Sequence, residues 1–168
     1  EWTGVGGDNA GNMHRNVIFR GDRVPELPAT AIDTGSPEGL WRALERQCGD
    51  ALPGCEALVI PHNSNLSDGL MFDGSAYTAA DAALRARTER LFEIVQHKGA
   101  SECFAGALPG IAADEDCSFE QLPYDSFAGQ NFSWKRKPPT PATGFYREIL
   151  RDGLRFERTL GVDPYRMG

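Results

Sequence analysis

The chain has 168 residues, a formal net charge of −7 at pH 7 and a pI near 5.0. This length suits one domain, and a hydrophobic content of 40% is enough to form a buried core. The acidic charge argues against general binding to nucleic-acid phosphates, and no apolar run approaches the roughly 20 residues that cross a bilayer. We therefore expect no nucleic-acid partner and no membrane partner.

The first half of the chain predicts strands and a helix in alternation. Residues 1–5 and 16–20 read as two strands joined by turn-forming residues. Residues 36–38 (Ser-Pro-Glu) then have the form of a helix start, with a Ser cap, Pro in the first turn and an acid near the positive end of the helix dipole. Apolar residues follow this start at helical spacing on one side: Leu40, Trp41, Leu44 and Cys48.

The middle of the chain continues this alternation. Residues 57–61 form a short apolar run ended by Pro, which suits a strand buried on both faces, as in parallel sheets. A second helix is expected from a Thr78 cap, with Asp81 three residues later, to Arg90. Residues 91–95 then read as another buried strand. Alternating strands and helices predict an α/β fold with parallel strands.

A long irregular region is expected at about 99–142. A loop of this length in a compact domain indicates a lid or a surface that meets another part of a larger protein. Its basic run, residues 134–137, is more simply a solvated loop than a phosphate-attracting lid. A last helix is expected from near Thr143 to Gly161. It would present four apolar side chains: Tyr146, Ile149, Leu150 and Leu154.

The cysteines fall into two local pairs, Cys48 with Cys55 and Cys103 with Cys117. Neither pair has the CxxC spacing of a structural zinc site. Two local disulfides would indicate an oxidising compartment such as the periplasm, whereas free thiols would suit the cytosol. We favour disulfides, and therefore a periplasmic or secreted location, because each pair encloses a turn-rich segment.

Two histidines and one carboxylate are candidates for a site. His62 directly follows an apolar strand and begins a polar string that ends at Ser67. Groups at the carboxyl ends of strands face the active site in α/β barrels and open sheets, so a ligand role competes with that of a hydrogen-bonded loop histidine. His14, taken alone, is more simply an exposed loop residue. Glu1 begins a hydrophobic strand, where a carboxylate needs a partner.

Two further residues lie in or after the strand expected at 91–95. Glu93 falls inside this apolar run, and a buried carboxylate needs a cation or a hydrogen-bond donor. His97 follows the strand and is the remaining histidine of the three in the chain. Either side chain would face a site at the carboxyl end of the strand.

Several strings in the chain resemble a bacterial branch of the PHP (polymerase and histidinol phosphatase) superfamily whose function is poorly characterised. The specific ones are PHNSNLS at 61–67 and QxKGxSEC at 96–103. The resemblance runs nearly the whole length, with further matches at 1–3 (EWT), 12–15 (NMHR), 114–117 (DEDC) and 161–165 (GVDPY).

The resemblance implies an α/β fold that is part of a distorted (β/α)7 barrel. PHP enzymes bind two or three divalent metals in such a barrel. Their bridging Glu matches Glu1, and the next two histidine ligands match His14 and His62. The family's early HxH pair would lie before Glu1 and its late Asp-x-His after Gly168. We therefore expect residues 1–168 to be a single incomplete barrel domain, an internal segment of a larger protein.

The resemblance further implies a metal-dependent hydrolase of the phosphoesterase type. Imidazole and carboxylate suit Zn²⁺, Mn²⁺ or Fe²⁺, and metal binding lowers the pKa of water from 15.7 to about 7. Arg15 is a candidate for gripping a substrate oxyanion, with a surface Arg as the alternative. Asn63 and Glu93 are candidates for supporting the ligands or the substrate. His97 occupies the variable position of its string and is discounted as a ligand.

The expected partners follow from these assignments. The substrate would be a small phosphorylated molecule, and the exposed strand edges of an incomplete barrel would favour association with itself or with the missing segments. The isolated segment would have little activity because its metals would lack ligands. The alternative is a non-catalytic secreted or periplasmic binding module on a degenerate barrel, which the Cys pairs and the long loop would suit.

Overall fold

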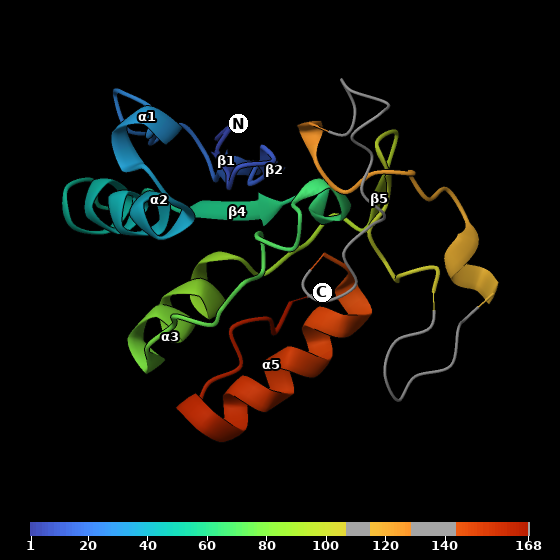
Figure 1. Cartoon of the computed structure of the whole chain (residues 1–168). Coiled ribbons are helices and arrows are strands. Elements are labelled where there is room, and N and C mark those ends of the chain that lie inside the picture. The colour runs from blue at the N-terminus through green and yellow to red at the C-terminus, as the bar shows by residue number, and fades with distance from the viewer. Residues whose placement is uncertain (107–114, 129–143, 168) are drawn as a thin grey trace.

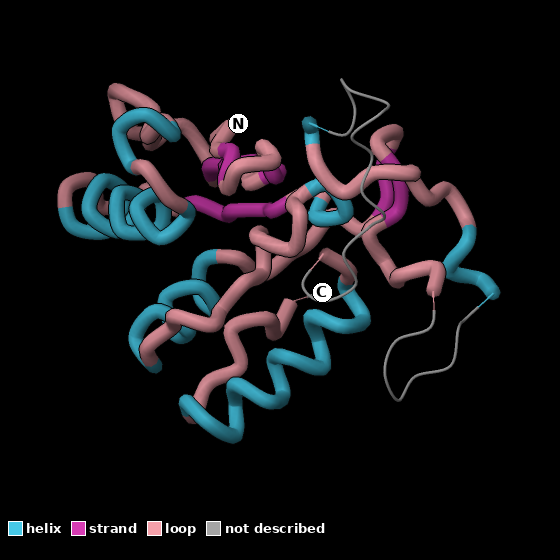
Figure 2. The backbone as a smooth tube through the Cα atoms, in the orientation of Figure 1, coloured by secondary structure: helices cyan, strands magenta, loops and turns pink. Residues whose placement is uncertain are grey.

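The computed structural model describes residues 1–106, 115–128 and 144–167. Figure 1 shows helices around the central strand β4 (Ala57–Pro61), with the N-terminus and the pair of β1 (Val5–Gly6) and β2 (Gly11–Asn12) above this strand in this view. Figure 2 shows that long loop segments connect the short regular elements. None of the helices in the described part of the chain is long and apolar enough to cross a membrane.

Strands β3 (Arg15–Phe19) and β4 (Ala57–Pro61) form the largest sheet of the described residues, and both lie where strands were predicted. They pair antiparallel, from Arg15 opposite Pro61 to Phe19 opposite Ala57. The strand predicted at 1–5 is reduced to an isolated bridge from Trp2 to Arg15 and to Val5, the first residue of β1, which turns back to β2.

The expected parallel arrangement is not seen among the described residues. The remaining sheet, β5 (Val95–Gln96) with β6 (Gly99–Ala100), is also antiparallel. The segment 91–94, predicted as a strand, makes one backbone bond toward β4, from Glu93 N to the Pro61 carbonyl. Within the described ranges the strands close no barrel, so the relation to a PHP barrel stays a prediction.

The helix predicted at Ser36 is confirmed as α2 (Pro37–Leu44), preceded by the one-turn α1 (Ala31–Thr34) and continued by a π-helical segment, Glu45–Asp50. Ser36 accepts a hydrogen bond from the Gly39 amide, as an N-cap does. The apolar side of this helical segment is buried, and it packs against the strands in a first core cluster made of Trp2, Leu40, Leu44 and Val59.

A second core cluster lies between the sheet and the last helix. Helix α3 (Ala79–Thr88) begins at the predicted Thr78 cap, which with Asp81 forms a complete capping box, and ends two residues before the predicted Arg90. Helix α5 (Tyr146–Leu160) ends at Gly161, which adopts the left-handed conformation with φ 77°. The cluster itself contains Met71, Phe72, Phe92, Ile149, Tyr165 and Met167.

Helix α5 buries a different face from the one that was predicted. Ile149 is buried, but Leu150 and Leu154 are 38% and 60% exposed. Gly153 is buried instead, and a Cβ atom there would lie 2.2 Å from the Asp163 carboxylate. The helix therefore turns its small residue toward the chain that follows it, which leaves the two leucines outward.

Both predicted disulfides are confirmed: Cys48 bonds Cys55, and Cys103 bonds Cys117. The first joins the end of the π-helical segment to the start of β4. The second encloses part of the predicted irregular region, whose described residues contain only short elements such as a 3₁₀ turn at Glu115–Ser118. Residues 107–114 and 129–143, including the basic run 134–137, lie outside the described residues.

A buried ion network joins β3 to α3. Glu89, Arg15 and Arg85 are each at most 1% exposed, and both arginines lie 2.8 Å from a Glu89 carboxylate oxygen. Trp41 Nε1 also donates to this carboxylate. Burial alone would raise the pKa of Glu89, but the two guanidinium charges outweigh it and lower the pKa. The carboxylate therefore stays ionised and neutralises one of two buried cations.

Replacing Glu89 with Gln is expected to destabilise the fold by about 3–5 kcal/mol, because it leaves both buried guanidinium groups without a counter-charge. The matched control is Glu45→Gln, which breaks an exposed pair with Arg87 and should cost less than about 1 kcal/mol. Urea unfolding of both variants measures the difference. Equal free energies of unfolding for the two variants would contradict a structural role for the network.

Candidate metal centre

The site is built on a polar loop, residues 62–67, that follows β4 and is buried throughout. Asn12 holds its start by donating from Nδ2 to the carbonyls of His62 (2.6 Å) and Asn63 (3.0 Å). The His62 amide also bonds the His14 carbonyl across the strand pair. These bonds satisfy buried polar backbone groups and fix His62 relative to β3.

The rest of the loop is anchored by its own hydroxyl and amide side chains. Ser64 Oγ donates to the Gly144 carbonyl, and Ser67 Oγ donates to the Ser64 carbonyl, both at 2.7 Å. Asn65 and Ser101 exchange two bonds, one of them through the Asn65 backbone amide. Gly11 lets the loop approach closely, since a Cβ atom there would lie 2.3 Å from the Ser67 carbonyl oxygen.

Glu1, His14 and His62 converge at the end of the β3–β4 pair. Each offers one ligand atom, and these atoms lie within 4.8 Å of one another. Glu1 Oε1 is 3.0 Å from His14 Nδ1 and 3.3 Å from His62 Nε2. The bridge between Trp2 and Arg15 places Glu1 beside His14. The structure thus brings together the three side chains that the resemblance to PHP enzymes singles out.

Both imidazoles are electrically suited to bind a cation. Burial lowers the pKa of His14 and of His62 below the usual 6.5, and the Glu1 carboxylate only partly opposes this effect. At pH 7 both rings are therefore neutral and keep a lone pair. Beside them, the Glu1 side chain is 42% exposed, so the cluster opens to solvent on the carboxylate side.

His62 Nε2 gives a direct test of whether these residues fit a metal. The atom is buried and has no hydrogen-bond partner in the described structure, although Glu1 Oε1 lies 3.3 Å away. A buried polar atom without a partner is unfavourable unless a ligand satisfies it. Imidazole nitrogen and carboxylate oxygen are typical ligands of Zn²⁺, Mn²⁺ and Fe²⁺, so the donor set fits a divalent cation.

Asn63 is placed to set the tautomer of His62. Its side-chain amide lies 2.7 Å from His62 Nδ1, and its backbone adopts the left-handed conformation (φ 55°) that Asn tolerates. Asn63 Oδ1 has no partner, so a 180° turn of the amide costs no bond and lets Oδ1 accept from Nδ1–H. That tautomer leaves the Nε2 lone pair free for a cation.

The other predicted site residues lie in different environments. Arg15 is fully buried, with its guanidinium bonded to Glu89 and to the carbonyls of Met13 and Met71, so its surroundings support the ion network rather than an oxyanion site. Glu93 is partly buried and accepts a hydrogen bond from Gln96. Burial lowers the pKa of His62, and the negative charge of Glu93 opposes this shift in part.

Two further residues near the cluster were not predicted from the sequence. Phe127 lies against His14, with ring centroids 5.3 Å apart. Lys98 lies over the ring of Phe127. His97, which was discounted as a ligand, is exposed and outside the cluster. The QxKGxSEC string was the available signal for Lys98, but Phe127 lies far along the chain in the irregular region, where no pattern marked it.

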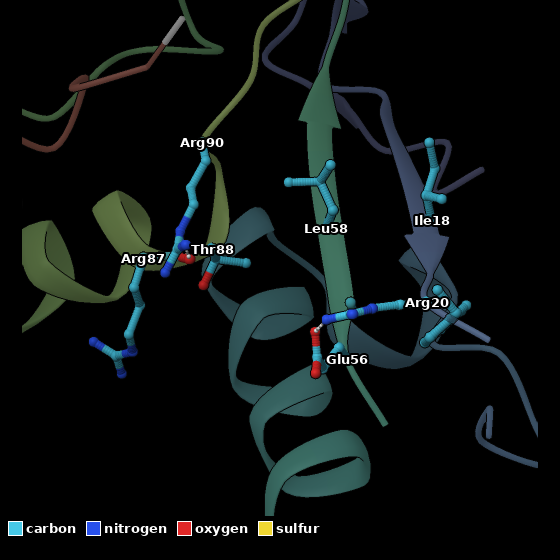
Figure 3. Close-up of a pocket in the computed structure, with 9 residues that line it drawn as sticks. Ile18, Arg20, Glu56, Leu58, Arg87, Thr88 and Arg90 are labelled. Atoms are coloured by element: carbon cyan, nitrogen blue, oxygen red, sulfur yellow. Dashed lines mark hydrogen bonds and ion pairs between the residues drawn. The ribbon is translucent and has the colours of Figure 1, made fainter. Parts of the chain in front are cut away.

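The pocket in Figure 3 lies at the other end of β4 from His62 and has a volume of about 520 Å³. Its walls include Leu58 of β4 and Ile18 of β3. Its arginines are largely neutralised, because Arg20 pairs with Glu56 inside the pocket and Arg87 pairs with Glu45 beside it. It holds no imidazole and no unpaired carboxylate, so the candidate chemistry lies at the histidine cluster instead.

The lowered pKa values of His14 and His62 predict how stability depends on pH in metal-free protein. The unfolded chain binds more protons than the folded one once the pH falls below about 6.5, so stability is full above that pH and declines as the pH falls toward the lowered values. Urea unfolding in chelator between about pH 7.5 and 5.5 measures this slope. A His14→Gln, His62→Gln variant should flatten this slope, and an equal slope in the variant and the natural protein would contradict the assignment.

Substitutions of Asn63 test its control of the His62 tautomer. Asn63→Gly keeps the left-handed backbone but removes the amide, and should weaken divalent-metal affinity by about 10- to 100-fold. Asn63→Asp retains an acceptor for Nδ1–H and should keep or strengthen binding. Calorimetric titration with Zn²⁺ compares the variants, and equal affinity in Asn63→Gly and the natural protein would exclude this role.

Comparison with known proteins places the chain in one family. The family model described as "Protein of unknown function (DUF3604)" matches residues 1–168, which is the whole chain. No curated protein and no solved structure matches it. The polar loop after β4 and the three converging side chains are thus features of a chain that belongs to the DUF3604 family.

Proposed function

We propose that the chain carries part of the metal centre of a metal-dependent hydrolase that acts on phosphoesters. The observation that carries this proposal is the convergence of Glu1, His14 and His62 around one point, where the buried His62 Nε2 has Glu1 Oε1 at 3.3 Å and no hydrogen bond among the described residues. The family description assigns no activity, so the proposal rests on these residues and on the resemblance to PHP enzymes.

The three side chains would share the work of holding the metal. His62 Nε2 and His14 Nδ1 would each supply a neutral nitrogen, because these are the ring atoms nearest to Glu1 Oε1. The carboxylate of Glu1 would supply an oxygen ligand beside both rings. A bound divalent metal would supply Lewis-acid activation of water and of a phosphoryl oxygen.

The surrounding residues would hold this arrangement in place. Asn63 would orient His62 through Nδ1, and Asn12 fixes the backbone on which both residues lie. Glu93 contributes negative charge near His62, which favours a cation. The three cluster residues are fewer than the ligands of a PHP site, so the remaining ligands would come from the HxH and Asp-x-His strings that the resemblance implies.

The two disulfides support a location in an oxidising compartment, in agreement with a periplasmic or secreted enzyme. The same observation favours the second candidate function, a secreted binding module that keeps the fold without catalysis. The two candidates can be distinguished by experiment, since only the hydrolase needs a bound metal and hydrolyses a phosphoester.

Metal binding and phosphatase turnover in the full-length natural protein test the proposal. Titration with Zn²⁺, Mn²⁺ and Fe²⁺ should show tight binding of at least one metal, with hydrolysis of a phosphomonoester by the loaded protein. Glu1→Gln and His62→Ala should each weaken metal affinity by more than about 10-fold and lower turnover at least as much, because each removes a ligand.

The control is His97→Ala, which removes the exposed histidine outside the cluster and should retain both metal affinity and turnover. Natural turnover and metal content in Glu1→Gln and His62→Ala would overturn the hydrolase proposal. A natural protein that binds no metal would instead favour the binding module.

A further inference from the structure

Lys98 is a cation placed beside a site that itself attracts cations. It lies in the two-residue turn between β5 and β6, where Gln96 pairs with Gly99. Its ammonium nitrogen is 6.0 Å from the ring centroid of Phe127, and that ring contacts His14. Phe127 therefore connects the lysine to the cluster, although Lys98 is far from Glu1 and His14 in the sequence.

The backbone around Lys98 is fixed by the same loop that carries His62. Asn65 donates from Nδ2 to the Lys98 carbonyl at 2.9 Å, and the paired bonds between Asn65 and Ser101 hold the other end of the turn. Gly99 has φ 95°, a conformation that favours glycine, and an added Cβ there would lie 3.0 Å from the Asn65 amide. The turn thus holds Lys98 in a defined position relative to His62.

The charge of Lys98 has no carboxylate partner within the part of the chain that the structure describes. The ring of Phe127, over which the ammonium group lies, contacts His14, so Lys98 stands one side chain away from the cluster. A lysine in this position opposes a bound metal on its own. The arrangement becomes favourable when an anion lies between the metal and the ammonium group.

We propose that Lys98 binds a phosphoryl oxygen of the substrate beside the Glu1, His14 and His62 cluster, so that the site selects anionic phosphate esters. This inference rests on the proposed metal centre. Lys98 would take the role of oxyanion binding that the sequence suggested for Arg15, whose guanidinium is buried in the ion network. Lysine is a common phosphate ligand because its ammonium group is a compact charge with three donors.

Binding of inorganic phosphate to the metal-loaded full-length protein tests the role of Lys98, with the metal that binds most tightly in the titration above. Lys98→Gln should weaken phosphate binding by about 10- to 100-fold, as expected for the loss of a charged hydrogen bond. The same variant should bind the metal as tightly as the natural protein or more tightly, because a nearby positive charge has been removed. A residue with only a structural role would not produce these opposite effects.

Two further variants complete the test. Lys98→Arg keeps the charge and should recover part of the phosphate affinity. Arg158→Gln removes an exposed cation from the last turn of α5 and should change phosphate affinity by less than about twofold, which controls for the change in net charge. Unchanged phosphate affinity in Lys98→Gln, with metal binding intact, would overturn this inference alone. Absence of metal binding in the natural protein would overturn the proposed metal centre as well.

Discussion

The loop from His62 to Ser67 is the constraint on which the site depends, because a buried polar segment must find a partner for each of its groups. Its partners come from regions far apart in the chain: Asn12 before β3, Ser101 after β6, and Gly144 before α5. Each bond satisfies the loop and also ties a separate region to it. The position of His62 is therefore determined by most of the fold rather than by β4 alone.

The buried network around Glu89 provides the second fixed point, and it holds the strand that begins directly after His14. Arg15 follows His14 directly, and its guanidinium is held by Glu89 while its backbone pairs with Trp2. The ion pair with Glu89 anchors the first residue of β3, and the pairing of Arg15 with Trp2 brings Glu1 beside His14.

The sequence predicted local features well because they depend on neighbouring residues. The helix caps at Ser36 and Thr78, the end of α5 at Gly161 and both disulfides each follow from a few adjacent side chains. Strand direction depends on pairing between distant segments, so the apolar run at 57–61 indicated a strand without indicating its antiparallel partner. The exposure of two leucines on α5 has the same cause, since helical spacing alone does not show which face meets the core.

Some residues of the candidate site could likewise be predicted from the sequence, and others could not. The resemblance to PHP enzymes singled out the three side chains that converge, whereas the environment of Arg15 could not be predicted, since its partner Glu89 lies 74 residues further along the chain. Lys98 differs from Arg15, because the sequence suggested no role for it and its proposed role follows from its neighbours in the structure. A divalent cation bound by the three side chains would repel the ammonium group of Lys98. An anion bound jointly by the metal and by Lys98 would turn that local repulsion into attraction, which is how a site of this charge pattern distinguishes a phosphate from a neutral ester.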